Sequence, residues 1–107
     1  LGVLLSQHGE VEQGRDALER SLAYWRRQGD PARIARELSS LAVVHRAEGE
    51  AEVARGMLAE AIELARVSGD AERLAAALSN LAIMDVDEDR PAEALARLRE
   101  ALALDRE

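Results

Sequence analysis

Apolar residues recur every three or four positions in each long segment of the chain. This period places them on one face of a helix and leaves charged residues on the other face. The segments 31–48 and 51–68 show the pattern most clearly. Their predicted apolar stripes comprise Ile34, Leu38, Leu41, Ala42 and His45 in the first, and Val53, Ala54, Met57, Leu58, Ala61, Ile62 and Ala65 in the second.

Short polar turns separate the periodic segments. Glycine ends four of these segments, at Gly9, Gly29, Gly49 and Gly69. Glycine readily adopts the left-handed conformation that terminates many helices. Asp30 and Asp70 follow two of these glycines, and aspartate is a favoured N-cap of the next helix. Asp89 replaces the glycine two residues before Pro91, and proline fits the first turn of a helix.

The periodicity predicts an all-α chain. The expected helices cover residues 1–8, 10–28, 31–48, 51–68, 71–87 and 91–106. Because the turns between them are only two or three residues long, neighbouring helices must run antiparallel. The six helices then pair into three hairpins. Composition agrees, since alanine and leucine dominate and the chain holds no Phe, one Tyr and one Trp.

The pattern repeats every 40 residues without a gap. Leu18, Leu58 and Leu98 show the interval, because 58−18 and 98−58 are both 40. A fixed period of this length is typical of a stacked helical array, in which each unit buries its face on the next. We expect one domain over residues 1–107, with units at about 1–30, 31–70 and 71–107. Because both ends of the sequence fall inside periodic segments, we interpret it as a fragment of a longer protein.

Charge and composition disfavour several function classes. The net charge is −7, which suits neither nucleic acid nor an anionic membrane surface. The chain has no cysteine and no apolar run long enough to span a bilayer. It contains no phosphate-binding loop, zinc-protease motif or nucleophile elbow. We therefore predict no enzyme activity, no cofactor and no metal, and, without a visible signal peptide, a cytoplasmic location.

The repeated residues carry a family resemblance. In register they read Leu1-Gly2-x-x-Leu5 then Gly14-x-x-x-Leu18, Leu38-x-x-Leu41-Ala42-x-x-His45 then Ala54-x-x-x-Leu58, and Leu78-x-x-Leu81-Ala82-x-x-Asp85 then Ala94-x-x-x-Leu98. This pattern resembles the tetratricopeptide repeat, in a branch with a 40-residue period in place of the usual period of about 34. The resemblance implies an α-solenoid of three hairpins with a right-handed superhelical twist.

The resemblance also implies a function in protein–protein interaction. In this family the first helix of each repeat lines a concave groove that holds a peptide or a helix of a partner protein. Carried over by register, the groove residues are Val3, Ser6, Gln7, Arg36, Ser39, Val43, Arg46, Ser79, Asn80, Ile83 and Val86. Val3, Val43 and Ile83 occupy one repeated position and would form an apolar row on an open face. The identity of the partner stays undetermined.

A second function remains open. The chain would then be a structural spacer or a homo-oligomerisation segment of a larger bacterial signalling or transcription regulator. Leu95, Leu98 and Leu102 favour this alternative, because they would leave an apolar edge uncovered on the last helix. Terminal repeats of soluble arrays normally carry a polar outer face.

Other conspicuous residues have structural interpretations. His45 stands at the family's aromatic position and is expected to pack between helices. We expect Tyr24 to lie in the core and Trp25 to pack against the next helix. The acidic run 85–89 is expected to be a solvated helix end, because its spacing does not meet that of a calcium loop. Local charge pairs at helical spacing are Glu12–Arg15, Asp16–Arg20, Glu52–Arg55, Glu63–Arg66 and Glu93–Arg97. Four arginines lie near the turn at Gly29 and form either a solvated face or a basic patch for an acidic partner: Arg26, Arg27, Arg33 and Arg36.

Overall fold

The computed structural model describes the backbone of residues 2–105 and the side chains of residues 9–104. Its helices are α1 (Gly2–Gln28), α2 (Pro31–Ala47), α3 (Ala51–Ser68), α4 (Ala71–Asp87) and α5 (Pro91–Asp105). Turns of two or three residues join them, and the described backbone contains no β-strand. The all-α prediction is confirmed.

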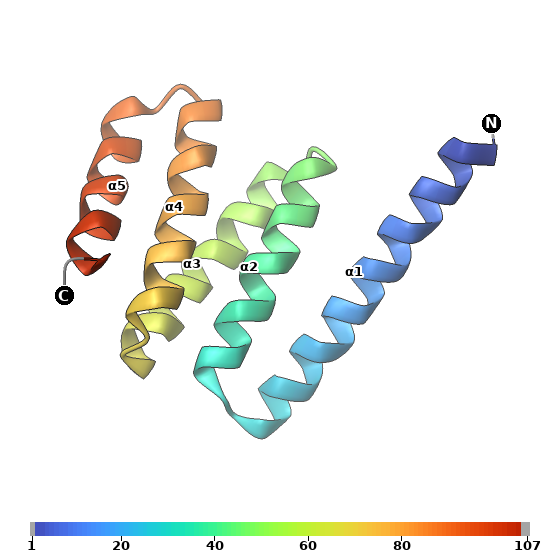
Figure 1. Cartoon of the computed structure of the whole chain (residues 1–107), viewed down its shortest axis with the longest axis horizontal. Coiled ribbons are helices and arrows are strands. Elements are labelled where there is room, and N and C mark those ends of the chain that lie inside the picture. The colour runs from blue at the N-terminus through green and yellow to red at the C-terminus, as the bar shows by residue number, and fades with distance from the viewer. Residues whose placement is uncertain (1, 106–107) are drawn as a thin grey trace.

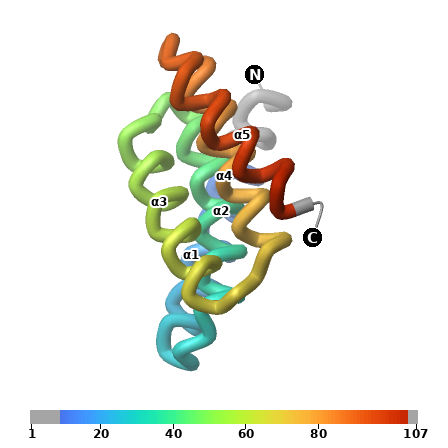
Figure 2. Tube along the Cα trace, turned by 90° about the vertical axis from the view of Figure 1, so that its left-hand side faces the viewer, coloured from blue at the N-terminus to red at the C-terminus, as the bar shows by residue number. Residues whose placement is uncertain are grey.

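The helices stack side by side in chain order (Figure 1). α2 packs antiparallel against α3, and α4 packs antiparallel against α5. α2 also contacts α4, which brings the first helices of the two hairpins together. Seen along the stack, α3 lies to one side of α2 and α4, so the helices form two layers (Figure 2). The shortest dimension of the chain is 21 Å, which is about two helix diameters.

The predicted helix boundary at Gly9 is wrong, and residues 2–105 form five helices and two hairpins rather than six helices and three hairpins. α1 continues through Gly9 as one helix. A glycine inside a helix costs only about 1 kcal/mol. The predicted first helix would have only about two turns, too few to bury a stabilising apolar face by folding back. Continuation is therefore favoured, and α1 and α2 diverge from their shared turn (Figure 1).

The other predicted boundaries that fall within residues 2–105 agree with the structure to within one residue, and those at residues 1 and 106 lie outside the described residues. The turn glycines have positive φ values, 69° at Gly29, 82° at Gly49 and 69° at Gly69. Asp89 adopts the same left-handed conformation, with a φ of 59°. The Asp30 side chain accepts a hydrogen bond from the backbone N–H of Arg33 at 3.2 Å, and Asp70 caps Arg73 in the same way at 3.0 Å. The turn residues therefore act as their types predict.

The core lies between α2, α3 and α4. Leu38, Leu41 and Leu58 are each 2% exposed or less. Ala54 and Ala61 of α3 are completely buried. This packing holds α2 and α4 next to each other and so defines the surface between them.

Candidate functional site

A hollow of about 210 Å³ lies between α2 and α4. Val43 and Arg46 of α2 and Asn80 and Ile83 of α4 form its sides. On each helix the two residues are three positions apart, so they project from the same face. The rest of the lining is Ala42, Leu58 and Met84, all buried. Sequence reasoning assigned the buried faces of the helices to the core alone and so missed the floor of this hollow.

Val43 and Ile83 are the exposed apolar residues of the hollow. They stand 40 positions apart, and each is 47% exposed. Branched apolar side chains that stay half-exposed beside a concave surface are typical of a binding site. The structure thus brings together two members of the predicted apolar row.

Four more predicted groove residues have described side chains, and none of these lines the hollow. Ser39 and Ser79 are half-buried on α2 and α4, whereas Val86 is 63% exposed. Arg36 is exposed and donates a hydrogen bond to Oε1 of Glu37 at 3.0 Å. Outside the described side chains lie Val3, Ser6 and Gln7.

Arg46 is the one charged residue among those that line the hollow. Its side chain is half-buried, and no Asp or Glu within residues 9–104 forms an ion pair with it. Asn80, also half-buried, lines the same hollow from α4. An apolar hollow with one positive charge and one amide is therefore the main feature of this surface.

Arginines at one repeated position hold the two three-residue turns. Arg15 of α1 forms an ion pair with Glu48, in the turn after α2. Arg55 of α3, 40 positions later, contacts Glu88 in the turn after α4 at 3.2 Å. These bonds join one helix to the next hairpin, whereas helical spacing predicted partners for Arg15 and Arg55 on their own helices.

Two further ion pairs are related by the same interval of 40 residues. Arg26 of α1 bonds to Glu60 of α3 at 2.7 Å, and Arg66 of α3 bonds to Glu100 of α5 at 2.7 Å. The hydrogen bond from Arg26 holds the pKa of Glu60 below its ordinary value of 4.5. The arginines therefore link alternate helices of the stack.

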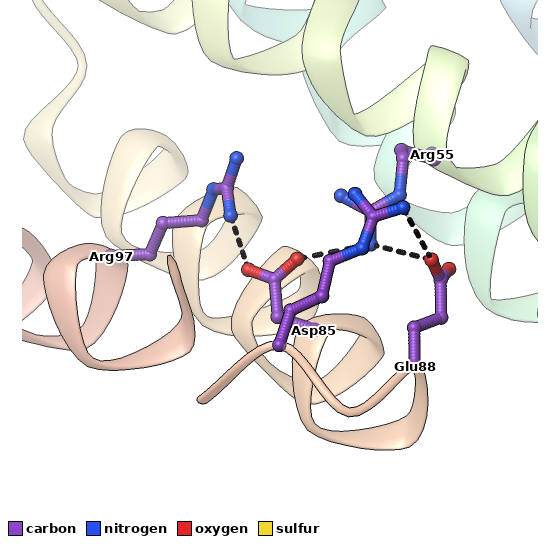
Figure 3. A network of polar contacts seen from close by, with 5 residues as sticks. Arg55, Asp85, Glu88 and Arg97 are labelled. Atoms are coloured by element: carbon purple, nitrogen blue, oxygen red, sulfur yellow. Dashed lines mark hydrogen bonds and ion pairs between the residues drawn. The ribbon is translucent and has the colours of Figure 1, made fainter. Parts of the chain in front are cut away.

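Asp85 at the end of α4 is fully buried, with 0% exposure. Arg55 donates a hydrogen bond to Oδ1 at 2.9 Å, and Arg97 of α5 donates to Oδ2 (Figure 3). Arg55 also contacts Glu88, so α3, α4 and α5 meet in one network. A buried carboxylate is tolerated when its oxygens are paired in this way. The predicted solvated helix end is therefore wrong for Asp85.

His45 occupies the matching position in α2. It is 8% exposed, which confirms the predicted packed histidine. Its Nδ1 lies 3.4 Å from Oε1 of Glu50, which Arg15 also contacts at 3.2 Å. α3 has Met57 where α5 has Arg97, because 97−57 is 40. The two matching sites thus differ at two positions: one site has His45 and Met57, and the other has Asp85 and Arg97.

The arginines around the turn between α1 and α2 are mostly paired. Bonds join Arg26 to Glu60, Arg33 to Asp30 and Arg36 to Glu37. Arg33 also lies over the Trp25 ring, 4.4 Å from its centroid. Trp25 packs against the core as predicted. Tyr24 is 46% exposed, so its predicted core position is wrong: it lies about 100° around α1 from Trp25.

α5 keeps an apolar stripe on its surface. Leu95, Leu98 and Leu102 are 49%, 40% and 57% exposed, at three- and four-residue spacing. This confirms the predicted apolar edge. Leu95 stands where α1 and α3 have Arg15 and Arg55. α5 therefore lacks the arginine that holds the next turn in the earlier helices.

None of the helices within the described residues is long and apolar enough to cross a membrane. Over the same part of the chain, no group of three or more His, Cys, Asp or Glu side chains is arranged to hold a metal ion. In the acidic run 85–89, both oxygens of Asp85 are bonded to arginines.

Part of the chain is similar in sequence to a known protein family. No curated protein shows significant similarity to the chain. The tetratricopeptide repeat family matches residues 33–107, a range that begins in α2 and includes both hairpins and the hollow between them. The matched range leaves out α1, the part that does not form a hairpin. Because the match covers well over half of its residues, the chain belongs to the tetratricopeptide repeat family.

Proposed function

We propose that the chain is a protein–protein interaction module that holds a peptide or a helix of a partner protein between α2 and α4. Tetratricopeptide repeats are non-enzymatic scaffolds that generally mediate protein–protein interaction. The supporting observation is that Val43 and Ile83, at one repeated position, are half-exposed on the two sides of one hollow. The module acts by presenting a preformed surface, and preorganisation lowers the entropic cost of binding.

The surface has the composition of a site for an amphipathic segment. Its floor is apolar and its sides carry two apolar and two polar side chains. An amphipathic helix or strand binds by placing spaced apolar anchors in such a groove. The polar residues then determine orientation.

The test removes the apolar surface and leaves the fold intact. The double variant Val43→Glu with Ile83→Glu is compared with Val53→Glu with Val67→Glu, which adds the same charge at exposed valines outside the hollow. A phage-displayed library of random 12-residue peptides is selected on each protein, and circular dichroism checks helicity. We expect peptides to be enriched on the wild type and on the control, but not on the groove variant. Equal enrichment on all three proteins would refute the groove.

The exposed stripe of α5 favours a second candidate function. Here the chain is a spacer or a homo-oligomerisation segment of a larger bacterial signalling or transcription regulator, and two copies meet through Leu95, Leu98 and Leu102. Light scattering should then show a dimer that dissociates on dilution. Leu98→Glu should give a monomer at every concentration. A wild type that stays monomeric at high concentration would eliminate this candidate.

A further inference from the structure

We infer that the partner segment carries a carboxylate beside an apolar side chain, and that Arg46 binds this carboxylate. The inference rests on the proposed function and adds the chemical class of the ligand. The occupant of the groove is thus an acidic, amphipathic peptide or helix.

Arg46 has no acidic partner among residues 9–104. Arginines at the interhelical contacts, such as Arg26, Arg55 and Arg66, bond to carboxylates of this chain. Arg46 is half-buried but forms no ion pair with any Asp or Glu of residues 9–104. Partial burial removes part of the water shell of a guanidinium, and a carboxylate is the partner that best replaces it.

The acidic side chains of α2 and of the turn that follows it are already paired within the chain. Glu48 and Glu50, in the turn that follows α2, are both engaged by Arg15. Glu37, also on α2, is bonded to Arg36. These pairs engage the acids of α2 and its turn, and a ligand can supply the carboxylate that Arg46 lacks.

The charge of Arg46 lies beside apolar surface. The other lining residues are apolar apart from Asn80, and an ion pair is stronger beside apolar surface than in open water. The residue 40 positions after Arg46 is Val86, which is 63% exposed. The positive charge therefore lies on the α2 side only, which orients the ligand with its carboxylate toward α2 and its apolar side chain against Ile83.

The experiment selects ligands by charge. The same peptide library is selected in parallel on the wild type and on Arg46→Glu. We expect peptides with Asp or Glu next to Leu, Ile, Val, Phe or Met on the wild type, and peptides with Lys or Arg at the corresponding position on the variant. Reversal of the sign of the selected charge is an outcome that a purely structural role of Arg46 would not produce.

A measurement of affinity makes the test quantitative. The peptide most enriched on the wild type is labelled with fluorescein, and its anisotropy is compared with that of a version with glutamine in place of glutamate. We expect the acidic version to bind about tenfold more tightly, as a charge-assisted bond predicts. Arg46→Gln should remove this difference. Arg27→Gln, which changes an exposed arginine outside the hollow, should preserve it.

The outcomes separate the ligand class from the groove itself. If the wild type and Arg46→Glu select the same peptides, or if the two labelled versions bind equally well, the role of Arg46 is refuted and the groove stands. If the wild type enriches nothing beyond Val43→Glu with Ile83→Glu, the groove is refuted together with its acidic ligand.

Discussion

Two turns of this molecule are held by arginine at the same repeated position, but in different chemical settings. The first junction comprises Arg15, His45, Glu48 and Glu50, and the second comprises Arg55, Asp85, Glu88 and Arg97. In the first, the buried residue is a histidine and the acids lie in the turn. In the second, the buried residue is a carboxylate with an arginine on each oxygen.

The difference shows how a repeat position changes its chemistry without losing its packing. His45 is accompanied by Met57, whereas Asp85 is accompanied by Arg97. A buried carboxylate needs paired donors, so aspartate at this position requires the second arginine. The first junction has no such requirement, and its more exposed pairs contribute little to stability. The second junction should therefore be far more sensitive to substitution.

The largest expected effect is the removal of both arginines from the second junction. Arg55→Ala with Arg97→Ala leaves Asp85 buried without a partner, which should lower the free energy of unfolding by about 3–5 kcal/mol. Urea denaturation measures the loss. Adding Asp85→Leu should restore most of it, because no buried charge then remains. A double variant that loses under about 1 kcal/mol would contradict the ion-pair account.

The next effect compares the centre of the stack with its end. Leu58 is 2% exposed and Leu98, at the same repeated position, is 40% exposed. Leu58→Ala should cost about 2–5 kcal/mol because it leaves a cavity. Leu98→Ala should cost about 1 kcal/mol or less, since part of its surface already faces water. Equal losses in thermal or urea unfolding would mean that the register of the stack is wrong.

A smaller effect tests whether the two junctions are interchangeable. Arg97→Met alone leaves Asp85 with one arginine and should cost about 1–3 kcal/mol. Arg97→Met with Asp85→His copies the first junction. Its loss of unfolding free energy should be smaller than that of Arg97→Met alone by about 1 kcal/mol or more. A double-mutant cycle in urea gives the coupling. Strictly additive losses would show that the two positions act independently.

The smallest expected effect concerns an ion pair outside both junctions. Because Arg26 lowers the pKa of Glu60 in the folded chain, this pair stabilises the fold above pH 4.5 and its contribution is lost as the pH falls below that value. Arg26→Gln should lower stability at pH 7 by about 1 kcal/mol or less, since both side chains are partly exposed. The difference from the wild type should shrink between about pH 5 and pH 3. A difference that is constant with pH would rule out the ion pair.

Features set by neighbouring residues were predictable from the sequence. The turns at Gly29 and Gly69 were predictable, because a left-handed glycine followed by a capping aspartate needs no distant partner. Val43 and Ile83 were predicted to share a surface, since the 40-residue period fixes their equivalence. The structure places both around one hollow.

Features set by distant partners were not predictable in this way. Asp85 was interpreted as a solvated residue because its partners, Arg55 and Arg97, lie 30 and 12 positions away. Gly9 and Gly49 are both followed by glutamate, yet only Gly49 lies in a turn. The turn at Gly49 is held by Arg15 from α1, through Glu48 and Glu50. Local sequence does not distinguish such contacts.

The most direct test of the account locates a bound peptide. Methyl NMR spectra of the chain are recorded during titration with the peptide most enriched on the wild type. The account predicts chemical-shift changes at Val43 and Ile83, and none at Leu95, Leu98 and Leu102 of α5. Changes confined to the leucines of α5 would contradict it and would identify the exposed face of the last helix as the binding surface.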